Sequence, residues 1–362
     1  FEQALSIRKE LYGEGHLHTA DSLEDMGLVY HNKGEHDKAL RYYEQALRVC
    51  KEVLGEKHHD TAVIINDIGI LYRDKGDYDN ALTCFRKSWS IKKGVLGERH
   101  PGTAACLTNI GVVFAYKQNF DEAIKCYEEA LSINKESLDK MNPGTAIILN
   151  NLCNTYNNKG DYDQALLHIE QAIHIWKNIF GVRHSNTATG IMNMGNVFYY
   201  KGDCDRALSC YEQSLSCFKE VFGERHPLVA DCLANIGGIN CSIGDLNIGM
   251  QYLEKALSIR KEIYGEKYYT VAQCYANIGL IYSNQGDYSS SLNYLGKAHD
   301  IFKEVSGERH PDTATVLCTM AQVYLELGDY QKALSCLEKG LEIHKETLGE
   351  RHPQIAITLG LI

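Results

Sequence analysis

Residues 101–133 read PGTAACLTNIGVVFAYKQNFDEAIKCYEEALSI, and this stretch decides the fold. Leu107, Ile110 and Phe114 are spaced three and four residues apart, which places them on one face of a helix. The helical pattern that follows the next turn consists of Ala123, Tyr127, Ala130 and Ile133. The stretch therefore predicts two antiparallel amphipathic helices, called helix A and helix B below.

This helix pair recurs along the whole chain with a period of 42 residues. The turn between the two helices carries a glycine in seven repeats and Gln118 in the remaining one: Gly34, Gly76, Gly160, Gly202, Gly244, Gly286 and Gly328. A fixed period of this length indicates units that bury their apolar faces against their neighbours. The expected fold is an all-α, right-handed superhelical α-solenoid.

The same period defines the expected domain organisation. We expect one array over residues 1–362, with a partial helix B at 1–12, eight full repeats at about 17–348 and a partial helix A at 352–362. Because the chain starts and stops inside a repeat, it is expected to be a piece of a longer protein. The incomplete ends leave self-association open.

Two short motifs predict where the helices begin and end. In Gly-Asp-Tyr, as at 160–162, glycine favours the left-handed cap of helix A and aspartate the N-cap of helix B. In Gly-Glu-Arg-His-Pro, as at 97–101, the proline suits the first turn of the next helix A. Glycine on helix A (Gly111) and alanine on helix B (Ala123) should let the two backbones approach closely.

Composition narrows the functional classes. The formal net charge of −10 argues against a dedicated nucleic-acid binder, and no apolar run is long enough to insert into a membrane. The thirteen cysteines are scattered singly at packing positions, which favours free thiols in a reducing compartment such as the cytoplasm. Phosphate-loop, His-Glu-x₂-His and Gly-x-Ser-x-Gly motifs are missing, so the sequence predicts no enzyme and no cofactor.

One histidine per repeat occupies the loop before helix A. These residues are His16, His58, His100, His184, His226, His310 and His352. Successive repeats should be too far apart for their histidines to share one ion, because zinc lies only about 2 Å from its ligand nitrogens. We therefore predict a structural role in the turn and no metal site.

The small and large residues of the helix pair resemble the tetratricopeptide pattern. Leu107-x₂-Ile110-Gly111-x₂-Phe114, followed by Ala123-x₃-Tyr127, carries that resemblance. The usual period of this family is 34 residues. The 42-residue period, with Ala-Leu-Ser-Ile at 130–133 and Gly-Glu-Arg-His-Pro at 97–101, is similar to the kinesin light chain type, also seen in nephrocystin-3-like proteins.

A series of asparagines with the same period, called the asparagine ladder below, is the candidate binding site. Asn109, Asn151, Asn193, Asn235 and Asn277 recur at the 42-residue spacing, off the apolar face of helix A. The resemblance implies that helix A lines the concave side, where primary amides can bond both the C=O and N–H groups of an extended peptide. The residues expected to join the ladder in peptide binding are Asn150, Asn154, Asn196, Tyr116 and Tyr200.

The expected function is a protein-interaction scaffold of the kinesin light chain-like cargo or adaptor type, with an extended peptide in its groove. Four residues before each ladder position the chain has no basic residue, so a preference for acidic cargo is in doubt. One alternative is a structural spacer in which the asparagines only brace neighbouring helices. Another is a regulatory repeat array of a larger signalling protein.

Overall fold

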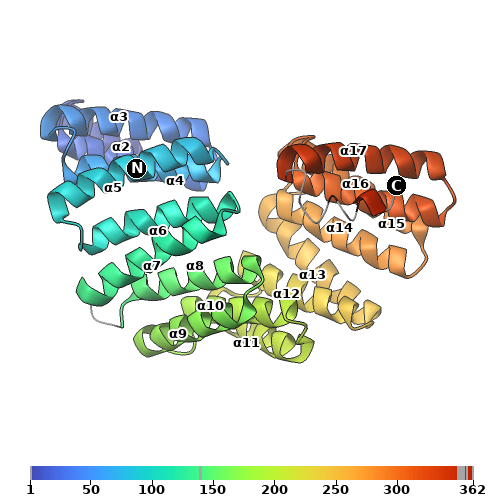
Figure 1. The fold of residues 1–362 in the computed structure, drawn as a ribbon. Helices are drawn as coiled ribbons and strands as arrows, with labels where there is room; N and C mark the ends of the chain where they lie inside the picture. The colour runs from blue at the N-terminus through green and yellow to red at the C-terminus, as the bar shows by residue number, and fades with distance from the viewer. Residues whose placement is uncertain (1, 138–140, 349–354, 356–357, 361–362) are drawn as a thin grey trace. The chain divides into compact units, whose positions relative to one another are not determined.

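The computed structural model describes residues 2–137, 141–348, 355 and 358–360. Up to residue 348 the described residues form seventeen α-helices, and the described residues as a whole contain no strand (Figure 1), which confirms the all-α fold. The partial helix A predicted at 352–362 falls mostly outside the described residues.

Long helices alternate along the chain as helix A and helix B of successive repeats. Helix A of each repeat is α2 (Leu17–Asn32), α4 (His59–Asp74), α6 (Pro101–Tyr116), α8 (Pro143–Lys159), α10 (Ser185–Tyr200), α12 (Pro227–Ser242), α14 (Tyr269–Asn284) and α16 (Pro311–Glu326). The B helices are α1 (Glu2–Tyr12), α3 (His36–Leu54), α5 (Tyr78–Leu96), α7 (Phe120–Ser137), α9 (Tyr162–Phe180), α11 (Cys204–Phe222), α13 (Leu246–Tyr264), α15 (Tyr288–Val305) and α17 (Tyr330–Leu348).

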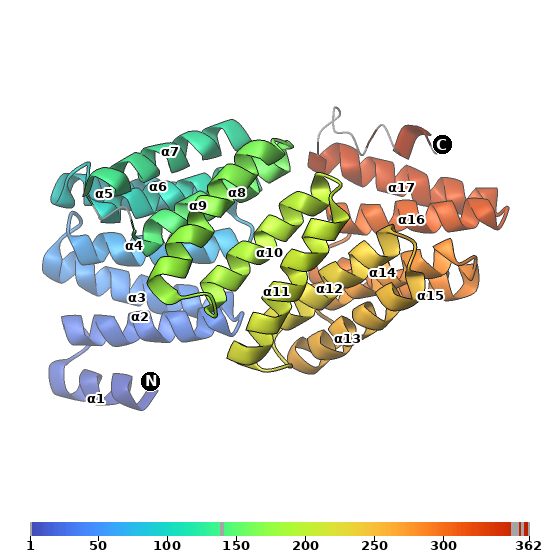
Figure 2. The same ribbon diagram turned by 90° about the horizontal axis from the view of Figure 1, so that it is seen from below.

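By proximity of its Cα atoms the chain divides into two compact units, Phe1–Val182 and Arg183–Ile362. Unit 1 contains α1 to α9, and unit 2 contains α10 to α17. Inside each unit, helix A packs on its own helix B, and helix B packs on the next helix A. Figure 2 shows these neighbours side by side, for example α12 with α13. The single array and its right-handed superhelical course stay predictions.

The glycine of helix A permits the closest contact inside a repeat. A Cβ atom on Gly111 would lie 2.7 Å from Cε1 of Tyr127, whose ring is 1% exposed. The equivalent glycines at 27, 69 and 195 face an aromatic ring at 2.7–2.8 Å, and those at 237 and 279 face a leucine. The predicted close approach of the two backbones is confirmed. The large side chain of helix B fills the space that the glycine leaves.

Helix ends follow the predicted capping residues. Gly160 ends α8 with φ 86°, and Gln118 takes the same left-handed region at φ 58° in the repeat that lacks the glycine. Asp161 accepts a hydrogen bond from the N–H of Gln164, three residues into α9, at 3.2 Å. These contacts satisfy backbone groups that the ends of a helix would otherwise leave without partners.

The loop histidines are N-caps of helix A. In His100, Nδ1 accepts a hydrogen bond from the N–H of Gly102 at 3.0 Å, and five other repeats share this geometry. Asn142 replaces the histidine before α8, where its Oδ1 accepts from the N–H of Gly144 at 2.7 Å. The predicted structural role of the histidines in the turn is confirmed for these six repeats, and His352 lies outside the described residues. In the part of the chain that the structure describes, no group of three His, Cys, Asp or Glu side chains could hold a metal ion.

All thirteen cysteines carry free thiols, and most of them lie in the helical packing. Burial raises the pKa of the Cys153 and Cys232 thiols to about 12 and that of Cys50 to about 11. None of the described helices is both long and apolar enough to cross a membrane. The cysteines therefore act as small apolar side chains, as their scattered positions predicted.

Candidate functional site

The asparagine ladder lies where neighbouring A helices approach one another. Helix α4 contacts α6 and α6 contacts α8 in unit 1, and α12 contacts α14 and α14 contacts α16 in unit 2. The ladder position and the positions three and seven residues after it share one stripe of each helix, because they are about one and two helical turns apart. The two units use this stripe differently.

In unit 1 the ladder is tied into a chain of side-chain hydrogen bonds. Asn109 Nδ2 on α6 donates to Asn66 Oδ1 on α4 at 2.8 Å. Asn66 Nδ2 in turn donates to Oδ1 of the neighbouring Asp67 at 3.4 Å. Asp67 bonds the carboxyl group of Glu24 on α2. At Asn109 the amide therefore braces neighbouring repeats.

The carboxyl groups of Glu24 and Asp67, at the end of this series of hydrogen bonds, lie in buried surroundings that disfavour a negative charge. Burial and the neighbouring Asp67 carboxylate raise the pKa of Glu24 to about 7, and burial also raises the pKa of Asp67. The folded protein thus keeps a proton on Glu24 that the unfolded chain releases nearer pH 4.5. Stability contributed by the protonated pair is present below that pH and is lost as the pH rises toward 7.

Replacing Glu24 by glutamine should remove this pH dependence. Glutamine stays neutral, so we expect Glu24→Gln to raise the free energy of unfolding at pH 8 by about 1–2 kcal/mol, after allowance for solvent screening. At pH 4.5 the change should be small. Urea unfolding at both pH values tests this. The exposed Glu44 on α3 is the control, and Glu44→Gln should stay within about 0.5 kcal/mol of the wild type. Equal stability of Glu24→Gln and wild type at pH 8 would contradict the expectation.

Of the other predicted residues of unit 1, Asn151, Asn154 and Tyr116 lie on this stripe, and Asn150 directly precedes Asn151. On α8, Asn150 and Asn151 are half-buried and Asn154 is exposed. Tyr116, at the end of α6, is 59% exposed and stacks on Tyr78, with ring centroids 5.7 Å apart. Asn154 and Tyr116 are therefore the exposed members of this group.

In unit 2 the residues of α10 make contacts within the protein. Asn196 Oδ1 accepts a hydrogen bond from the hydroxyl of Tyr211 at 2.6 Å. Asn193 is half-buried. Tyr200 is 60% exposed and meets the ring of Tyr199 edge-on, with centroids 5.5 Å apart.

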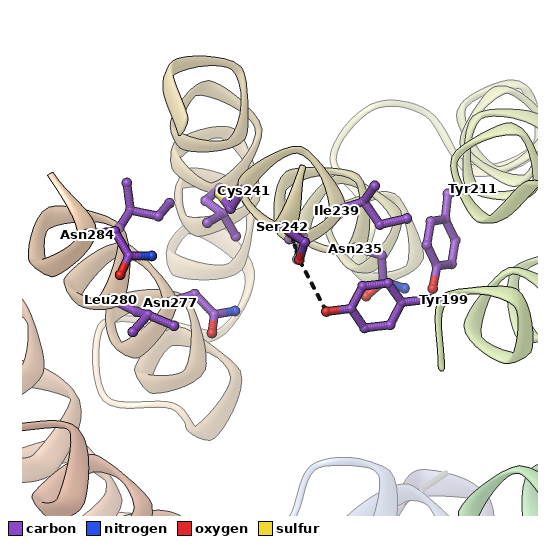
Figure 3. Close-up of a pocket in the computed structure, with 13 residues that line it drawn as sticks. Tyr199, Tyr211, Asn235, Ile239, Cys241, Ser242, Asn277, Leu280 and Asn284 are labelled. Carbon is purple, nitrogen blue, oxygen red and sulfur yellow. Dashed lines mark hydrogen bonds between the residues drawn. The ribbon is translucent and has the colours of Figure 1, made fainter. Parts of the chain in front are cut away.

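Asn235 and Asn277 line one cavity of unit 2, with a volume of about 330 Å³ (Figure 3). Figure 3 shows Asn235 of α12 beside the ring of Tyr199, and Asn277 on the neighbouring α14. Tyr199 comes from α10, and the remaining lining residues come from α11 to α14: Tyr211, Ala234, Gly238, Ile239, Cys241, Ser242, Leu253, Leu280, Ile281 and Asn284. The hydroxyl groups of Tyr199 and Ser242 are 3.4 Å apart. Two of the ten predicted residues thus meet in a cavity.

The amide groups in this cavity are available for a ligand. Within the described part of the chain, the side chains of Asn235, Asn277 and Asn284 have no hydrogen-bond partner in the protein. Asn235 is half-buried, whereas Asn277 and Asn284 are exposed. Each amide can donate two hydrogen bonds and accept through its oxygen. Together they offer donors and acceptors along two adjacent helices.

The other lining residues were missed by the sequence-based prediction, among them Tyr199, Ser242, Leu280 and Asn284. Leu280 and Asn284 lie three and seven residues after Asn277, and Ser242 lies seven after Asn235. The helical spacing of the ladder could therefore have identified them. Tyr199 carries no such signal, because the stripe passes through its neighbour Tyr200.

Charged side chains are missing from the described lining of this cavity. The charged residue one helical turn before Asn235 is Asp231. Asp231 Oδ1 accepts from Arg260 Nη2 at 2.7 Å, and Arg260 also donates to the carbonyl of Thr270 at 3.0 Å. The Arg260 side chain is 9% exposed, so this ion pair belongs to the packing of α12, α13 and α14.

Three solved structures similar to this chain share its fold. The quorum sensor NprR from B. thuringiensis, in its apo form, has a TM-score of 0.68 at 17% identity, over 94% of this chain and 93% of that one. The Rap conjugation gene regulator of plasmid pLS20, in complex with the Phr* peptide, has a TM-score of 0.59 at 17% identity, over 80% of this chain and 74% of that one. BtubC (BKLC) from P. vanneervenii has a TM-score of 0.54 at 21% identity, over 64% of this chain and 92% of that one.

The family comparison covers nearly the whole chain, whereas none of the curated proteins matches it. The tetratricopeptide repeat model matches residues 1–52, 22–92, 60–136, 144–220, 189–248, 235–304, 277–346 and 312–362. The chain therefore belongs to the tetratricopeptide repeat family, and its 42-residue repeats are similar to those of kinesin light chains.

Proposed function

We propose that this chain is a protein-interaction scaffold that binds an extended segment of a partner protein along the A helices of unit 2. The observation that carries the proposal is the cavity where the amides of Asn235 and Asn277 lie without protein partners. An extended peptide presents unpaired backbone N–H and C=O groups, and primary amides can bond both kinds of group.

The repeat fold supports a role in binding a partner protein. Repeat solenoids use the surface lined by equivalent positions of successive repeats for binding. A protein of the same fold, the Rap regulator of plasmid pLS20, has been solved in complex with the Phr* peptide. The thirteen free cysteines favour a reducing compartment such as the cytoplasm for the interaction. A cargo-adaptor role like that of kinesin light chains is the finer form of the same proposal.

A structural spacer is the second candidate, and the Asn109–Asn66 hydrogen bond favours it. If every ladder residue acted like Asn109, the asparagines would stiffen the array and bind nothing. The difference between Asn109, which is bonded to the A helix of the preceding repeat, and Asn235 and Asn277, which have no such bond, separates the two functions.

The test sorts a library of N-acetylated, C-amidated nonapeptides on the wild-type chain and on Asn235→Ala/Asn277→Ala. At about 1 kcal/mol per hydrogen bond, the double substitution should weaken binding of the selected peptides about ten- to hundredfold. Isothermal titration calorimetry measures the affinity, and circular dichroism checks the fold. Asn109→Ala is the matched control, which should lower stability and leave affinity unchanged. Unchanged affinity of the double variant, or no peptide selected, would favour the spacer.

A further inference from the structure

Gly238 stands in the cavity wall where every other repeat has a larger side chain. It lies on α12, three residues after Asn235 and in contact with the cavity. The residues at the same place in the other seven repeats are Leu28, Ile70, Val112, Asn154, Asn196, Leu280 and Gln322. Among the eight A helices, α12 alone has no side chain at this position.

Packing does not require a glycine at this position. A Cβ atom on Gly238 would meet no atom within 4 Å, whereas one on the adjacent Gly237 would lie 2.9 Å from Cγ of Leu253. Glycine inside a helix costs about 1 kcal/mol relative to alanine. At Gly237 that cost allows α13 to pack closely. At Gly238 no neighbouring atom requires a glycine. The missing side chain leaves open space between α12 and α14.

The surroundings of this space define the side chain that could enter it. The apolar part of the wall is formed by Ile239, Leu253, Ile281 and Leu280, of which Leu280 is 46% exposed. The polar part consists of amide and hydroxyl groups, and no Lys, Arg, Asp, Glu or His side chain lines the cavity among the described residues. A charged side chain would lose water here without gaining an opposite charge.

We propose that the space at Gly238 is a specificity pocket for one uncharged, apolar side chain of the bound segment, of the size of leucine or phenylalanine. This inference rests on the proposed function, because Asn235 and Asn277 would hold the backbone on either side of the inserted residue. The volume of about 330 Å³ is at the lower end of ligand pockets, which span about 300–1,000 Å³.

The geometry of an extended chain limits the preference to one position. Successive side chains of an extended peptide point to opposite sides. When one side chain enters the pocket, those of the two adjacent residues point away from it. Their N–H and C=O groups stay within reach of the amides. The expected consensus is therefore a single apolar residue between neighbours of unrestricted type.

Filling the pocket with the residue of the next repeat provides the test. Gly238→Leu copies Leu280, should leave the melting temperature equal or higher, and should weaken binding of the nonapeptides selected on the wild type by at least about tenfold. Selection on Gly238→Leu itself should favour glycine or alanine at the consensus position. In a selected peptide, changing the apolar residue to aspartate should weaken binding to the wild type by a similar factor.

The outcomes distinguish this inference from the proposed function. If Gly238→Leu keeps full affinity while Asn235→Ala/Asn277→Ala loses it, the pocket assignment is wrong and the amide clamp stands. If neither variant loses affinity, or the wild type selects no peptide, both are wrong. Gly238→Ala serves as the fold control, since it restores helix propensity and leaves most of the space open.

Discussion

Replacing Gly237 by alanine is expected to destabilise the protein by about 2 kcal/mol. The added methyl group would lie 2.9 Å from Cγ of Leu253 and 3.0 Å from the backbone oxygen of Gly249, so α12 and α13 must move apart. Overpacking of this kind costs about 1–3 kcal/mol, offset in part by the better helix propensity of alanine.

The neighbouring Gly238 is the matched control on the same helix. Gly238→Ala should raise stability by up to about 1 kcal/mol, because its methyl group would contact nothing. Thermal unfolding measures the difference between the two variants. Hydrogen exchange should locate the loss in α12 and α13, since each repeat contacts only its neighbours. If Gly237→Ala were as stable as Gly238→Ala, the close helix contact would not be a source of stability.

Removal of the Arg260 side chain should have the larger effect, about 2–4 kcal/mol. Arg260→Ala would leave a cavity between α13 and α14, leave the carbonyl of Thr270 without its donor and leave Asp231 without its counter-charge. Much of that cost should be recovered in Arg260→Phe, because the adjacent repeats have Phe218 and Phe302 at this position.

Urea unfolding of the three proteins measures this series. Lys255 on α13 is exposed and makes a suitable control, with Lys255→Ala expected within about 0.5 kcal/mol of wild type. A loss below 1 kcal/mol for Arg260→Ala would mean that the ion pair and its packing contribute little. Equal losses for the alanine and phenylalanine variants would instead assign the effect to the lost ion pair and hydrogen bond, and not to packing.

Much of the fold could be predicted because each local signal has one structural meaning in every repeat. Gly160 and Asp161 predicted the helix boundary that the structure has, and Gly111 predicted the close helix contact. Periodicity could not predict the division into two compact units, since the 42-residue register continues across residues 182 and 183. Local patterns report contacts between adjacent helices and carry no information on longer distances.

The candidate site was only partly predictable, for a related reason. The ladder position is the same in every repeat, yet Asn109 bonds to the preceding A helix while Asn235 and Asn277 line a cavity. What differs is a residue close to the ladder position: Asn66 on the preceding A helix supplies an acceptor to Asn109, and Gly238, one turn along α12 from Asn235, leaves open space. Such differences arise between particular pairs of repeats. Residues that recur every 42 positions therefore do not reveal them.

The reactivity of the buried thiols would report how often each part of the repeat array opens to solvent. Only thiolates react quickly with alkylating reagents, and burial holds the pKa of Cys50, Cys153 and Cys232 far above neutral pH. Each of these cysteines can be modified only when its own repeat opens to solvent. The pattern of labelling along the chain would therefore rank the repeats by how often they open, without any added probe.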